Sequence, residues 1–256
     1  TLAMSSAASD VYKRQTYPMI VAGCYFGITP WNMNRLSMDE SDFSFAILLF
    51  GIFFIISNQI AGRMLVPKYG TKLIMSLAFP IVTFATLLSV ISPSYFYFLL
   101  SFIPLGIGWG ASGPIGGIHS QLIEQHFKKI ITPYYAMGFN IGILVGGALA
   151  GIIMRNNYEP YLSFFILSFL SIFVSFFVYS FGLPRNLDFK GKGEKFKIPE
   201  TNVLLFGLLL FFVFGSGGII MDWSTLWLSK DLNTPLYLAS MGLIFFSIGG
   251  IFSNLF

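Results

Sequence analysis

The sequence has little charge. Only 10% of its 256 residues are Asp, Glu, Lys or Arg, whereas 55% are hydrophobic, and the mean hydropathy is +0.75. A soluble protein needs more charge on its surface, so the lipid bilayer is the solvent that fits this composition. The single cysteine, Cys24, excludes an internal disulfide and lies in an apolar stretch, where a thiol is expected to act as a small hydrophobe.

Metal-ligand and nucleotide-binding patterns are also missing. The two histidines, His119 and His126, are seven residues apart, which is two helical turns and gives no metal-ligand spacing. No Gly-x4-Gly-Lys-Ser/Thr loop occurs, so an ATP-driven pump has no support. We therefore expect no metal and no cofactor.

An intramembrane enzyme and a channel are the alternative functions. Residues 110–113 match the Gly-x-Ser-Gly segment of rhomboid-type proteases, with Ser112 in the serine position. The nearest histidine, His119, would lie about 10 Å along the same helix axis, too far to activate that serine. For a channel, the sequence offers no charged ring or filter-like repeat.

Both ends of the sequence indicate a fragment. Residues 5–15 resemble the in-frame translation of a transposase sequencing adapter, so residues 1–15 are excluded from fold reasoning. The last residue, Phe256, lies inside an apolar run with no polar flank, which predicts that the gene continues.

Apolar stretches long enough to cross a hydrocarbon core of about 30 Å follow one another along the chain. We expect eight membrane-spanning helices, near residues 17–33, 43–62, 73–91, 95–118, 133–153, 161–183, 201–221 and 235–256.

Lys and Arg gather in alternate loops. Ten lie in the loops after the second, fourth and sixth spans, against three in the others, with Lys13 and Arg14 set aside. By the positive-inside rule the basic loops and the N-terminus are cytoplasmic. The longest and most charged connection, residues 184–200, is predicted to be a linker between residues 16–183, with six helices, and residues 201–256, with two.

The loop after the second span carries a motif. Lys68, Tyr69, Gly70 and Lys72 match the Arg, Phe, Gly and final basic positions of Gly-x-Leu-x-Asp-Arg-Phe-Gly-x-Arg, the loop between helices two and three of the major facilitator superfamily (MFS). The chain resembles this family here, although Pro67 stands where the family often has Asp. The resemblance implies that the loop acts as a cytoplasmic gating loop.

The seventh span carries a second resemblance. Gly218 is followed by Asp222, Trp223 and Ser224, which looks like the Gly-x-x-x-Asp-Trp-Ser segment of a bacterial MFS subgroup loosely related to sugar permeases. The family resemblance implies an all-α membrane protein with the MFS fold, of which eight of twelve helices are present, and two six-helix bundles with substrate bound between them.

Five residues are candidates for the substrate pathway. A carboxylate near a span often marks an ion or substrate path, so Asp222 is one, although an external interface beside Trp223 and Trp227 is the favoured alternative. Asn32, Trp109 and Asn140 are expected to line the N-terminal wall, and Asp222 with Trp223 the C-terminal wall. The Gly-rich runs around Trp109 and Asn140 permit either interrupted helices or plain close packing.

These observations predict a secondary transporter in the bacterial inner membrane. It is expected to work as a monomer by alternating access, on a small solute such as a sugar or another polar metabolite. A coupling proton or cation is a further expected partner, with Asp222 as its binding group, and no nucleic acid is expected.

Overall fold

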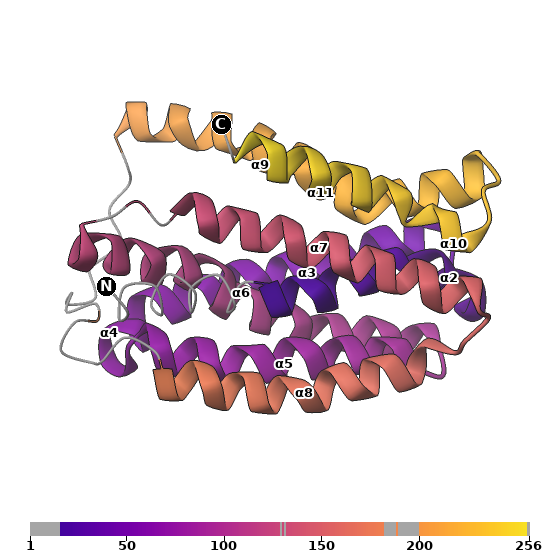
Figure 1. The fold of residues 1–256 in the computed structure, drawn as a ribbon, viewed down its shortest axis with the longest axis horizontal. Coiled ribbons are helices and arrows are strands. Elements are labelled where there is room, and N and C mark those ends of the chain that lie inside the picture. The colour runs from indigo at the N-terminus through magenta and orange to yellow at the C-terminus, as the bar shows by residue number, and fades with distance from the viewer. Residues whose placement is uncertain (1–15, 129, 131, 182–187, 189–199, 255–256) are drawn as a thin grey trace.

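The computed structural model describes residues 16–128, 130, 132–181, 188 and 200–254. Within these residues the chain is helical and contains no strand (Figure 1). A first helix covers residues 16–27. The other α-helices and the two π-helical turns, η1 and η2, are α2 Thr29–Leu36, α3 Glu40–Ile60, η1 Ala61–Leu65, α4 Val66–Tyr69, α5 Thr71–Ile91, α6 Tyr95–Phe127, α7 Thr132–Arg155, α8 Pro160–Phe181, α9 Thr201–Leu226, η2 Trp227–Asp231, α10 Leu236–Ala239 and α11 Met241–Ser253.

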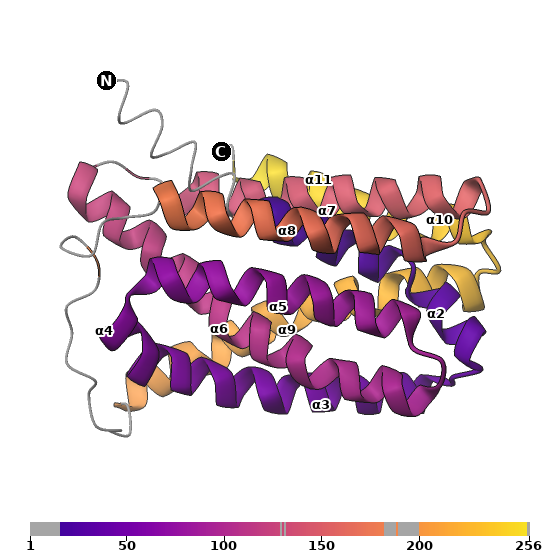
Figure 2. The ribbon, with the colours of Figure 1, turned by 90° about the horizontal axis from the view of Figure 1, so that it is seen from below.

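Seven helical segments are long and apolar enough to cross a membrane, and they run roughly along one direction (Figure 2). They bear many exposed large apolar side chains, above all on α8 and α9, where Phe173 and Phe214 are 71% and 74% exposed. Such surfaces are stable against lipid tails and not against water. The all-α membrane fold predicted from the sequence is confirmed. The first predicted span, residues 17–33, is covered by the first helix and part of α2, which are not among the seven segments.

Two sets of helices pack most closely. The helix α5 lies between α6 and α8, and α3 lies against α6, whereas α7 packs against α11. The first helix contacts both sets. Tyr25 hydrogen-bonds Ser89 of α5 at 2.6 Å, and the Tyr17 hydroxyl donates to the carbonyl of Leu167 in α8. On the α7 side, a Cβ at Gly23 would meet the backbone of Ile143. The first helix is buried along most of its length, with Cys24 fully enclosed.

Glycines bring several of these helices into backbone contact. A Cβ at Gly106 or Gly110 of α6 would meet the backbone of α3, and one at Gly146 of α7 would meet the backbone of the first helix. The helix α6 is continuous from Tyr95 to Phe127. Of the two readings of the Gly-rich runs, close packing describes this helix, because the small residues serve contact and the helix is not interrupted.

Most residues between the predicted second and third spans, which end at 62 and begin at 73, are helical. The connection there is therefore much shorter than the loop expected from the sequence. The backbone runs from α3 through η1 into α4, and Pro67 is accommodated in the first turn of α4, where its missing N–H costs little. The chain then turns at Gly70, whose φ of 88° is a left-handed conformation that glycine adopts easily.

Candidate functional site

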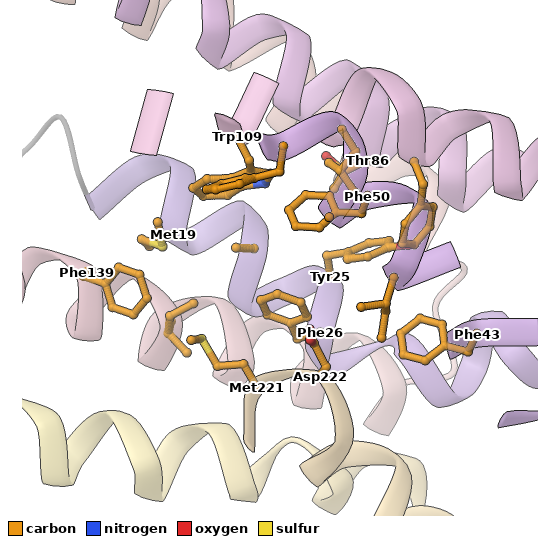
Figure 3. A pocket seen from close by; sticks show the side chains of 17 residues that line it. Met19, Tyr25, Phe26, Phe43, Phe50, Thr86, Trp109, Phe139, Met221 and Asp222 are labelled. Carbon is orange, nitrogen blue, oxygen red and sulfur yellow. The ribbon is translucent and has the colours of Figure 1, made fainter. Parts of the chain in front are cut away.

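A cavity of about 290 Å³ lies where the first helix, α3, α5, α6, α7 and α9 meet. Its wall is mainly aromatic and aliphatic. Figure 3 shows the rings that surround it, which include Tyr25, Phe26, Phe50, Trp109 and Phe139. Residues 16–155 form most of the wall, and α9 contributes Met221 and Asp222. The cavity therefore lies between the helices that precede and follow residues 184–200.

Few polar groups face this cavity. The Tyr25 hydroxyl is bonded to Ser89, and the Thr86 hydroxyl lies within hydrogen-bond distance of the carbonyls of Val82 and Thr83, at 2.9 and 2.8 Å. Asp222 is the one charged residue in the lining. Within the described residues its carboxylate has neither a hydrogen bond nor an ion-pair partner. A solute that enters the cavity thus meets rings and one carboxylate.

Two of the five predicted pathway residues, Trp109 and Asp222, line the cavity. Asp222 lies in α9, which continues past the predicted end of its span at residue 221 to Leu226, and its carboxylate is part of the lining. Trp223 is not in this lining: it borders a separate recess with Glu40 and Lys230, and its ring meets that of Phe43.

The two predicted amides lie outside the lining. Asn32 is buried at the far end of the first helical span, where its side-chain oxygen accepts a hydrogen bond from Arg35 at 3.0 Å. Asn140 donates to the carbonyl of Ala136 at 3.0 Å and faces Gly250 of α11. Both hydrogen bonds are therefore made within the amide's own helix.

The segment formed by α9 and η2 contacts α3 and the first helix at one end of the molecule, which we call the ion-pair end. Lys230 Nζ lies 2.6 Å from Glu40 Oε1, and the rings of Phe43 and Trp223 meet edge to face with centroids 5.7 Å apart. Between Trp223 and Lys230 in the sequence, the Thr225 hydroxyl donates a hydrogen bond to the carbonyl of Phe26 at 2.9 Å. These contacts close the cavity on that side.

The opposite end, which carries Lys68, Lys72 and Lys128, is called the basic end. There α9 begins without cover: every side chain from Thr201 to Phe214 is exposed. Lys72 lies over the ring of Tyr179 at 4.8 Å and Lys68 over that of Tyr69 at 5.0 Å, so the predicted gating residues contact α8 and α4.

Sequence reasoning missed a polar cluster at the basic end. Asp188 accepts hydrogen bonds from the backbone N–H and the hydroxyl of Thr71, both at 2.8 Å, and the same hydroxyl is 2.8 Å from His119 Nδ1. The carboxylate caps the start of α5. It lies next to the motif that has Pro67 in place of the family's Asp, yet it comes from a segment 117 residues away, and no local pattern could have indicated it.

The cluster also bears on the enzyme alternative. His119 bonds Thr71, while the buried Ser112 hydroxyl has no hydrogen-bond partner among the described residues. The pair therefore does not form a nucleophile and base. In the part of the chain that the structure covers, no group of three or more His, Cys, Asp or Glu residues is placed to hold a metal ion.

Comparison with known proteins agrees with this architecture. Residues 19–256 match the Major Facilitator Superfamily. The chain is also similar to an uncharacterized MFS-type transporter of Yersinia pestis, with 20% identity over 226 residues, which are 86% of this chain and 57% of that protein. It thus spans little more than half the length of this relative. Because the family match covers nearly all of the chain, the chain belongs to the Major Facilitator Superfamily.

Proposed function

We propose that the protein is a secondary transporter that carries a small solute across the membrane by alternating access. The proposal rests on the cavity between the helices that precede residues 184–200 and the helices that follow them. It also rests on the contacts between these two groups of helices at the ion-pair end. A cavity that is closed on one side is what a carrier needs to bind solute from a single compartment at a time.

Alternating access requires a second state in which the ion-pair end opens. The contacts to be broken are the Glu40–Lys230 ion pair, the Phe43–Trp223 ring contact and the Thr225 hydrogen bond. The ion pair is exposed, and the buried Thr225 contributes a single hydrogen bond. Contacts of this kind are of modest strength, so the two states can have similar free energies. Solute binding then biases the balance between them.

The proposal includes the arrangement predicted from the sequence. Residues 16–183 form one bundle, residues 184–200 a linker, and residues 201–256 the start of a second bundle. The basic end faces the cytoplasm of a bacterium, so the structure corresponds to a state closed toward the outside. A coupling proton or cation would have one carboxylate in the lining at which to bind, Asp222.

The proposal is tested by flux measurements on the full-length gene product in lipid vesicles. A panel of labelled solutes is offered, and we expect at least one to enter chemically unchanged, at a rate that saturates at modest concentration. Vesicles without protein provide the control. A flux that rises linearly with concentration would identify a channel, a chemically altered solute an enzyme, and the absence of flux across a broad panel would refute the proposal.

A further inference from the structure

The composition of the cavity wall restricts what can bind there. Eight of its lining residues are aromatic, and Asp222 supplies the one charge. A carboxylate that leaves bulk water for such a wall loses hydration and is stabilised by a cation brought close to it. The faces of aromatic rings are electronegative and attract the same kind of group. Ring faces and carboxylate thus favour positive charge.

The wall suits other solutes poorly. A sugar needs several hydrogen-bond partners, but the Tyr25 hydroxyl is already bonded to Ser89 of α5 and the Thr86 hydroxyl to carbonyls of its own helix. The amides of Asn32 and Asn140 lie elsewhere. Unpaired hydroxyls in the cavity would cost binding free energy. An anion would be repelled by Asp222. A hydrated inorganic cation has no apolar surface with which to contact most of the wall.

We propose that the cavity binds a small monovalent organic cation with an apolar body, whose positive group lies against Asp222 and whose body packs among the rings. This inference rests on the proposed transport function and names its substrate class in place of the sugar expected from the sequence. The volume of about 290 Å³ is at the lower limit of pockets for drug-sized ligands, so the solute is small.

Two probes of the same shape separate charge from apolar fit. Benzyltrimethylammonium carries a quaternary nitrogen, and neopentylbenzene has carbon in that position and no charge. Affinities are measured by equilibrium binding to the purified protein in detergent. We expect the cation to bind at least about tenfold tighter than the neutral isostere. Equal affinities, or tighter binding of the isostere, would overturn the inference.

Three variants locate the charge. Asp222→Asn should weaken the cation about tenfold and leave the isostere unchanged, whereas Asp222→Glu should retain the preference for the cation. Asp231→Asn is the matched control, because Asp231 is exposed at the end of η2 and outside the cavity. An unchanged cation affinity in Asp222→Asn would overturn the inference. If that variant does not fold, the comparison of the two probes on the unaltered protein still tests whether the cavity prefers a cation.

Failure of this inference can be told apart from failure of the transport proposal. Saturable flux of a neutral solute that benzyltrimethylammonium does not inhibit would keep the transporter and reject the cation as its substrate class. Tight, Asp222-dependent binding of the cation without flux of any solute would keep the binding site and reject the transporter.

Discussion

At the scale of single residues, two glycines of α6 differ in whether a side chain would fit at their position. Gly110 and Gly113 lie one turn apart on α6, but a Cβ at Gly110 would meet the backbone of Phe54 in α3, whereas a Cβ at Gly113 has no neighbour within 4 Å. Both glycines belong to the same Gly-rich run, and the sequence gives no reason to treat them differently.

Alanine at these two positions should therefore have opposite effects. Gly110→Ala forces α6 away from α3, and we expect a loss of about 1–3 kcal/mol in the free energy of unfolding. Gly113→Ala adds a methyl group in open space and improves helix propensity, so its effect should be neutral or a gain of up to about 1 kcal/mol. Thermal unfolding of the two variants in one detergent measures the difference. A similar melting temperature for both would show that α6 does not approach α3 as described.

Residue types on a helix could be predicted from the sequence, but the direction each side chain faces could not. Trp109 and Asp222 are in the cavity lining, while Asn32 and Asn140 bond to a side chain and a carbonyl three or four residues away. A run that is apolar all round has no polar face to fix its rotation about the helix axis. The sequence is therefore equally compatible with an amide that faces the cavity and with an amide that bonds to a neighbour in its own helix.

At the scale of helices, the apolar spans predicted the order of the long helices but neither their ends nor the short elements α4, α10, η1 and η2. The helix α6 extends to Phe127, nine residues past the predicted end at 118, and α9 continues through Leu226. Apolar runs end where the hydrocarbon ends, whereas backbone hydrogen bonding continues into the interface. Both extensions place polar residues. The extension of α9 contains Asp222, which lines the cavity, and the extension of α6 contains His119, which contacts Thr71.

The ion pair between α3 and η2 gives a prediction about motion. Glu40 and Lys230 are well exposed, so their pair adds little to folding, but it joins elements that alternating access must separate. A reporter cysteine at Gly51, which lines the cavity and has open space for a side chain, should react with maleimide from the ion-pair end. Glu40→Lys should raise this rate by up to about fivefold.

Exchange of the two charges provides the control. In the double variant Glu40→Lys with Lys230→Glu an ion pair can form again, so the labelling rate should return toward that of the unaltered pair. Failure of the double variant to slow the reaction would mean that the pair does not hold this end closed. The enclosed thiol of Cys24 is expected to contribute little background.

At the scale of the whole molecule, the family could be predicted from two short motifs and the pattern of spans, and the match over residues 19–256 confirms it. What no sequence pattern showed is how segments far apart in the chain meet. The Thr71–Asp188 bonds join residues 117 positions apart, and the Lys230–Glu40 contact joins residues 190 apart. These two contacts lie at opposite ends of the bundle, one next to the motif predicted to gate and one at the closed side of the cavity.

The positions of those ends relative to the membrane lead to the last prediction. The helix α7 has 24 residues and is about 36 Å long, enough to cross a hydrocarbon core, so the connections before and after it face opposite compartments. By the positive-inside rule we predict that the basic end, with Lys128 and Glu200, is cytoplasmic and that the connection with Tyr158 is outside. In intact cells, an impermeant maleimide should therefore label Tyr158→Cys, while Lys128→Cys and Glu200→Cys should react only after permeabilisation. A reversed pattern would preserve the fold and invert the orientation, whereas opposite accessibility of Lys128→Cys and Glu200→Cys would contradict an even number of spans between them and with it the two-bundle carrier.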